Sequence, residues 1–235
     1  MYRAGWHLWP KDWTVENYIR AWSKANFSKY MLNSIFYSIS STLISVTSSA
    51  LAGYAFARYN FPGRKWIRLI VMGMVFLPTS TSILPVFDLM QRLHLLNSPF
   101  AVILALSGSV GFSAMLFEGY FRNIPRDLYD AMEVDGASFF QQIRITLPLA
   151  KPVISTSVIM AFNASWQEYF IPLVFTLGKP ELRTLAVGLR SFTGQYSSDT
   201  SGFAAATTIS IIPIVIVFIL FQRQFVDGLA GSVKG

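Results

Sequence analysis

Long apolar runs separated by short polar segments dominate the chain. In chain order there are five such runs, at 31–57, 69–87, 98–117, 152–175 and 202–222. Four of them contain no charged residue, and the fourth, 152–175, contains only Glu168. Each is close to the roughly 20 residues that a helix needs to cross a bilayer. The alternating pattern of a membrane barrel is not visible. The sequence therefore predicts an all-α, polytopic membrane protein with five transmembrane helices.

Cations gather between these runs and predict an orientation. The segment after the first run and the segment between the third and fourth runs each hold four: Arg58, Arg64, Lys65 and Arg68, then Arg122, Arg126, Arg144 and Lys151. The segment between the second and third runs holds only Arg92. The positive-inside rule thus places both cation-rich loops and the C-terminus in the cytoplasm. The N-terminal segment, expected outside, is also cationic and weakens this bias; it lacks the apolar stretch of a signal peptide.

The composition also favours a membrane protein over a soluble one. Hydrophobic residues make up 53% of the chain and charged residues 13%, about half the charged share of a soluble domain. The formal net charge of +7 fits loops that face an anionic membrane surface better than it fits a nucleic-acid partner. There is no cysteine, which excludes disulfides and thiolate metal sites.

Several of the predicted spans are not simple apolar rods. Pro78 and Pro85 lie in the second, Pro213 lies in the fifth, and serine and threonine recur along the first. Membrane helices tolerate proline where neighbouring helices or hydroxyls bind the freed carbonyl groups. Hydroxyl residues also allow close helix packing. A wetted pathway and ordinary packing both stay open as interpretations.

The loop 121–151 is patterned as two short helices joined by a turn. Its signals are, in order, a cap and first turn at Asn123 and Pro125, a turn at Asp135–Gly136, a capping box at Ser138 and Gln141, and an end near Leu147–Pro148. They predict a helix–turn–helix knob that projects from the membrane. Such a knob serves either as packing or as a docking surface for a soluble partner.

A known family shares this segment. The run Asp130-Ala131-Met132-Glu133-Val134-Asp135-Gly136-Ala137, followed by Ile145-Thr146-Leu147-Pro148, closely resembles the EAA loop of ABC importer permeases. Two positions depart from the usual pattern: Asp130 replaces its glutamate and Met132 its second alanine. The resemblance implies a type I ABC importer transmembrane domain whose cytoplasmic coupling helix fits into a cleft of an ATPase subunit. The coupling residues would be Asp130, Ala131, Met132, Glu133, Asp135, Gly136, Ala137, Leu147 and Pro148.

Other segments resemble the carbohydrate-uptake branch, which includes the MalG-type permeases of maltose importers. They are Trp166–Glu168, Arg183–Gly188 and the ending Gly228–Gly235. The division expected from this is an exterior N-terminal segment at 1–30, a permease domain at 31–226 with its coupling loop at 121–151, and a cytoplasmic tail at 227–235. Family members usually have six spans, so a further span would precede Met1.

The resemblance also implies partners and a mechanism. The chain would be a multi-pass protein of a prokaryotic cell membrane that moves a sugar, polyol or glycerol phosphate by alternating access. It would act with a second permease subunit as a heterodimer, two ATPase subunits and an extracytoplasmic solute-binding protein. The chain has no phosphate-binding G-x-x-x-x-G-K-[ST] loop, so we expect no cofactor on this chain, with ATP and Mg used by the partner ATPase.

The acidic residues of the knob would pair with ATPase cations, or else form a solvated face. Proline or a bulky residue at Gly136 is expected to uncouple ATP hydrolysis from transport.

Four polar or aromatic residues are candidates for the solute path: Asn163, Trp166, Gln167 and Glu168. Aromatic faces cover sugar CH groups, amides bind hydroxyls, and a charge within a span must avoid lipid. Alternatively, Glu168 lies near the exterior end and braces its helix. The residues Val233, Lys234 and Gly235 end a tail that either is flexible or inserts between the ATPase subunits.

Two other function classes stay open. The same architecture could import a non-sugar solute, such as an amino acid. A channel or a membrane-embedded enzyme would need a pore ring or a catalytic constellation, and the sequence shows neither. The sequence does not identify the sugar.

Overall fold

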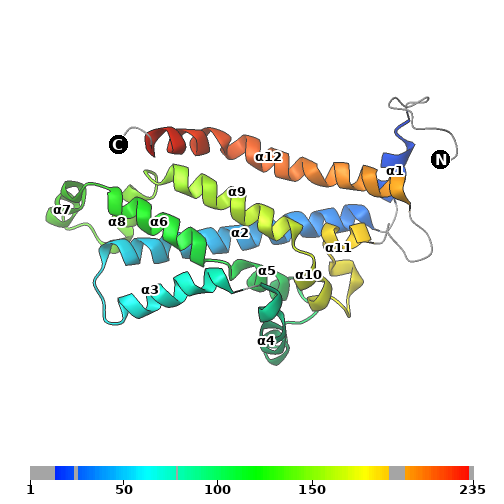
Figure 1. Ribbon diagram of the computed structural model, residues 1–235, viewed down its shortest axis with the longest axis horizontal. Helices are drawn as coiled ribbons and strands as arrows, with labels where there is room; N and C mark the ends of the chain where they lie inside the picture. Colours follow the sequence, from blue (N-terminus) through cyan, green and yellow to red (C-terminus); the bar gives the residue numbers. More distant parts are fainter. Residues whose placement is uncertain (1–13, 24–25, 78, 191–198, 233–235) are drawn as a thin grey trace.

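The computed structural model describes residues 14–23, 26–77, 79–190 and 199–232, and every regular element in these residues is helical (Figure 1). The α-helices are α1 Glu16–Ser23, α2 Phe27–Arg58, α3 Arg64–Gly73, α4 Thr79–Arg92, α5 Pro99–Ser107, α6 Gly111–Asn123, α7 Arg126–Val134, α8 Phe139–Thr146, α9 Lys151–Gln167, α10 Phe170–Phe175, α11 Leu185–Leu189 and α12 Thr200–Ser232. Short 3-10 turns occupy Met74–Phe76 and Pro180–Leu182. The all-α prediction is confirmed for the described residues.

Two helices are long and apolar enough to cross a membrane on their own, Phe27–Arg58 and Thr200–Gln224. Three further helix pairs pass the same test only as bent spans: α3 with α4 (113°), α5 with α6 (48°) and α8 with α9 (84°). Length and composition thus allow up to five spans. The first and last apolar runs are single helices as predicted, whereas the middle three are broken. The run 152–175 is interrupted at Glu168–Tyr169, between α9 and α10.

Helix α2 runs through the centre of the bundle and packs chiefly on α6 and α9 (Figure 1). Several of its buried serines bond to the segments around it. Ser45 and Ser49 donate hydrogen bonds to the carbonyl oxygens of Ser109 (3.3 Å) and Val110 (3.1 Å), at the break between α5 and α6. Ser41 donates to the Ser165 hydroxyl oxygen at 3.0 Å. At these positions the serines serve helix packing and stabilise a broken span.

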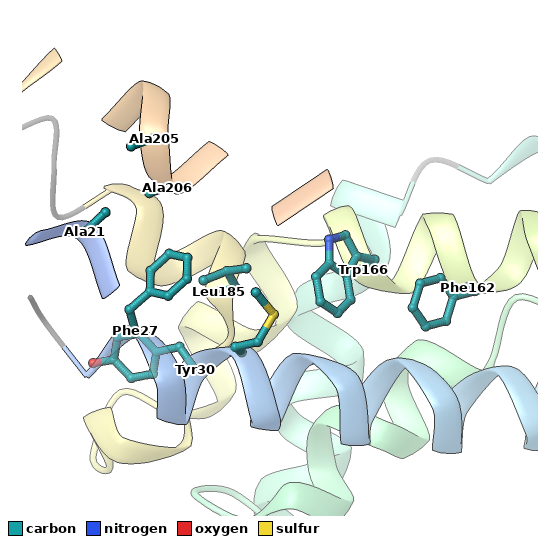
Figure 2. Close-up of a cluster of buried hydrophobic side chains, with 9 residues drawn as sticks. Ala21, Phe27, Tyr30, Phe162, Trp166, Leu185, Ala205 and Ala206 are labelled. Carbon is teal, nitrogen blue, oxygen red and sulfur yellow. The ribbon is translucent and has the colours of Figure 1, made fainter. Parts of the chain in front are cut away.

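A buried cluster holds α12 against the bundle. Figure 2 shows its members on α1, α2, α9, α11 and α12: Ala21, Phe27, Tyr30, Phe162, Trp166, Leu185, Ala205 and Ala206. Trp166 is 5% exposed, stacks on Phe162, and donates its indole N–H to the Ser210 carbonyl at 3.1 Å. A buried indole needs such a partner, so Trp166 joins α9 to α12.

One buried carboxylate fastens α3, which otherwise has little packing. Glu118 on α6 is 3% exposed. Its two oxygens lie 2.8 Å from Arg68 Nε of α3 and 2.6 Å from Arg122 Nη2 one turn along α6. A buried charge is tolerated only when it is paired, and here two arginines pair it. The sequence prediction ended the third apolar run at 117 and did not anticipate this buried charge.

Candidate functional site

The predicted knob, residues 126–146, is present as α7 and α8 at one end of the molecule, near the end of α12 (Figure 1). Helix α7 begins after Pro125, with Asp127 in its first turn, where a carboxylate complements the helix dipole. Asn123 was predicted to cap this helix, but it is the last residue of α6. This prediction was wrong because α6 continues beyond the end of the apolar run at 117 and ends at Asn123, just before Pro125. Asn123 therefore belongs to the end of α6 and not to the start of α7.

The turn between the two helices is a Schellman motif. Gly136 has φ +69°, and its N–H donates to the Glu133 carbonyl at 3.0 Å. The next N–H, that of Ala137, donates to the Met132 carbonyl at 2.9 Å. This pair of hydrogen bonds satisfies the last carbonyls of α7. It requires a residue in the left-handed backbone conformation, which glycine adopts without strain. The predicted turn is confirmed.

Helix α8 starts with the predicted capping box. The Ser138 N–H donates to Gln141 Oε1 at 2.7 Å. In the reciprocal contact, the Ser138 side chain accepts the backbone N–H of Gln141. The helix ends at Thr146, with Leu147 as its C-cap and Pro148 exposed just beyond. Two local signals therefore fix the relative position of α7 and α8.

The outer face of the knob is acidic with an apolar tip. Val134 is 88% exposed, and Asp130, Ala131, Glu133, Asp135 and Gly136 are exposed with it. Met132 is 5% exposed and faces inward, so the larger side chain at this motif position does not alter the outer surface. Ala137 and Leu147 are half-buried. The carboxylates give the outer face a negative charge, which a partner with a cationic surface would complement.

The knob is tied to α2 by a residue that the sequence did not single out. The Tyr54 hydroxyl donates to Gln142 Oε1 at 3.0 Å, and Gln142 Nε2 donates to the Ala137 carbonyl at 3.1 Å. The Tyr54 ring also meets Phe121 and Phe139 edge-on, with centroids 5.3 and 5.8 Å away. Helix α8 and the turn are therefore anchored to α2. No local sequence pattern predicts that Tyr54 contacts Gln142, because the two residues lie 88 positions apart in the chain.

A second candidate site is a polar pocket of about 250 Å³ among α2, the α5–α6 break and the α9–α10 break. Its polar lining is Ser45, Ser109, Ser113, Ser165 and Glu168. Broken membrane helices are tolerated where they line a cavity, as here. A larger pocket of about 540 Å³ on α2, α9 and α12 is lined mostly by apolar side chains.

Of the four predicted path residues, only Glu168 lines the polar pocket. Its Oε1 accepts the N–H groups of Phe170 (2.9 Å) and Ile171 (3.3 Å) and so caps α10. Trp166 lies in the core cluster instead. Asn163 and Gln167 hydrogen-bond to each other at 2.6 Å, with Gln167 exposed. The tail residues Val233, Lys234 and Gly235 lie outside the described residues. Within the described part of the chain, no group of three or more His, Asp or Glu is arranged to hold a metal ion.

Comparison with known proteins decides the family. A model of the binding-protein-dependent transport system inner membrane component matches residues 30–230. The chain belongs to this family. It is thus a transport permease of the inner membrane that acts with other ABC transporter components.

The relatives of this permease extend over nearly its whole length. The sulfoquinovosyl glycerol transport system permease SmoH of Agrobacterium fabrum is 33% identical over 96% of the chain and 80% of SmoH. The trehalose/maltose transport system permease MalG of Thermococcus litoralis is 34% identical over 94% of the chain and 82% of MalG. A bacterial ABC transporter that imports the acidic polysaccharide alginate includes a chain with the same fold, at a TM-score of 0.81 and 24% identity over 92% of this chain and 81% of that one.

Proposed function

We propose that this permease is one transmembrane subunit of an ATP-driven importer that takes up a sugar by alternating access. The observation that carries the proposal is the family match, together with relatives such as SmoH and MalG whose names state sugar solutes. The same evidence disfavours a non-sugar solute, the runner-up. The proposed solute class is a di- or oligosaccharide or a related polyol or glycerol phosphate.

The knob is the surface through which we propose that ATP hydrolysis drives the permease. Its exposed carboxylates at Asp130, Glu133 and Asp135 and its apolar tip at Val134 suit a cleft with cationic walls on a soluble ATPase. The proposed orientation places the knob, the loop 121–151 and the tail 227–235 in the cytoplasm. The other proposed partners are a second permease in a heterodimer, two ATPases and an extracytoplasmic binding protein.

The test of this function is solute uptake by reconstituted vesicles. Vesicles would contain the permease with its partner permease and ATPase subunits, and the binding protein would be added outside. We expect labelled oligosaccharide to accumulate only when ATP is enclosed and the binding protein is present. Uptake that needs neither, or a strict preference for amino acids, would refute the proposed function.

The polar pocket is the place where we propose that the solute passes this subunit. Glu168 caps α10 through Oε1 alone, which leaves Oε2 to bind a sugar hydroxyl. Glu168→Gln keeps one acceptor oxygen for the cap and replaces the other with an amide. We therefore expect Glu168→Gln to raise the solute concentration for half-maximal uptake about tenfold, the cost of about one charged hydrogen bond, with ATPase activity retained.

Glu181→Gln is the matched control for Glu168→Gln, since it makes the same change at an exposed carboxylate on the 3-10 turn Pro180–Leu182, outside the pocket lining. An unchanged half-maximal concentration in Glu168→Gln, or an equal change in both variants, would show that Glu168 only braces the helix.

A further inference from the structure

Arg58, the last residue of α2, lies where α2 and α6 end. Its Nη2 donates hydrogen bonds to the carbonyl oxygens of Phe121 (2.7 Å) and Ile124 (2.9 Å). These carbonyls belong to the last turn and the C-cap of α6, where a helix leaves its acceptors without internal partners. A guanidinium at this place satisfies them and complements the negative end of the helix dipole. Arg58 thus joins the ends of α2 and α6.

The same guanidinium contacts the knob. Its Cζ lies 3.3 Å from the centre of the Tyr129 ring, on α7, which is within cation–π range. The tyrosine ring attracts the cation through its π face, and burial raises the pKa of Tyr129 further above its ordinary value. One side chain therefore connects the ends of two membrane helices with the first helix of the knob.

The two helices of the knob have separate attachments to the last turns of α2. Helix α7 is held by Arg58 through Tyr129, and α8 is held by Tyr54 through Gln142. The two anchors lie four residues apart, one turn of α2. Both anchors also contact the end of α6: Tyr54 meets the Phe121 ring edge-on, whereas Arg58 hydrogen-bonds the Phe121 and Ile124 carbonyls. Helix α6 leads back to the polar pocket through Ser113.

We propose that Arg58 is a positioning residue for energy coupling, which makes the ends of α2 and α6 follow any displacement of the knob. The inference rests on the proposed role of the knob as the ATPase contact. Without Arg58 the knob keeps its Schellman turn, its capping box and the Tyr54 anchor. It still folds and docks, but α7 loses the side-chain link that ties it to the end of α2 and to the last carbonyls of α6.

The test is Arg58→Lys in the complete reconstituted transporter. Lysine keeps the positive charge, but a single ammonium cannot bind two carbonyls and lie over the Tyr129 ring together. We expect solute uptake per ATP hydrolysed to fall about fivefold or more, the lower end of measured coupling effects. The amount of ATPase that copurifies should not change. Arg92→Lys, in an exposed ion pair with Asp88, is the matched control and should transport as the wild type does.

A double-mutant cycle separates positioning from general damage. If Arg58 acts through Tyr129, then Arg58→Lys with Tyr129→Leu loses no more coupling than the worse single variant. Normal uptake per ATP in Arg58→Lys, or losses that multiply in the double variant, would overturn the inference. If Gly136→Pro uncouples the transporter and Arg58→Lys does not, only the inference about Arg58 fails. If Gly136→Pro also transports normally, the proposed role of the knob fails with it.

Discussion

Gly136→Pro is expected to reduce solute uptake per ATP hydrolysed by at least about tenfold, with the permease still inserted in the membrane. Proline fixes φ near −65°, whereas Gly136 has φ +69°, and proline lacks the N–H that binds the Glu133 carbonyl. The Schellman turn therefore cannot form, and α7 and α8 lose their relative position. Transport and ATP hydrolysis measured on the same vesicles give the ratio.

Gly136→Asn is the matched control for this effect. Asparagine tolerates the left-handed conformation, and nothing lies within 4 Å of a Cβ placed at position 136. We thus expect Gly136→Asn to keep most of the coupling. The expectation that a bulky residue here uncouples the transporter stays a prediction, because a side chain at φ +69° is strained even where there is space for it. Equal losses in the proline and asparagine variants would contradict the account.

Gly53→Val is expected to destabilise the folded permease by about 3 kcal/mol, the upper range for overpacking a core. At position 53, α2 packs closely against α6. A Cβ there would lie 2.5 Å from Phe117 Cβ and 2.8 Å from the Ala114 carbonyl oxygen and the Glu118 nitrogen. These atoms belong to the backbone or its first side-chain carbon, so the two helices would have to separate. The melting temperature of the purified protein measures the loss.

Gly119→Val is the control, since it makes the same change in a helix. No atom lies within 4 Å of a Cβ built at Gly119. Valine is a slightly better helix former than glycine, so we expect a change within about 1 kcal/mol. Similar melting temperatures for the two valine variants would show that the contact of α2 with α6 is looser than the structure indicates.

The features that the sequence predicted are those that local chemistry determines. Helices α2 and α12 follow from long runs, 31–57 and 202–222, that no charged residue interrupts. The knob follows from capping signals that act over three or four residues, such as Ser138 with Gln141. The glycine turn is equally local, because Gly136 closes it with carbonyls of α7.

The features that the sequence missed depend on contacts between distant segments. The break between α5 and α6 is stabilised by Ser45 and Ser49 of α2, more than 60 residues earlier. The apolar residues of the run 152–175 are spread around the helix and not gathered on one face. Its pattern therefore did not show that Trp166 faces α12 or that the helix stops before Glu168. Arg58 was counted only as a loop charge, and its partners on α6 and α7 became visible only in the fold.

Site-specific cross-linking from the tip of the knob tests the central claim most directly. The chain has no cysteine, so Val134→Cys introduces a single thiol at a position that is 88% exposed. A thiol-bound photoreactive probe at this position should form an adduct with the ATPase subunit, more strongly when ATP is bound. Phe76→Cys, 86% exposed on the 3-10 turn after α3, should form none. No ATPase adduct from position 134, or equal adducts from positions 134 and 76, would contradict the assignment of the knob as the coupling surface.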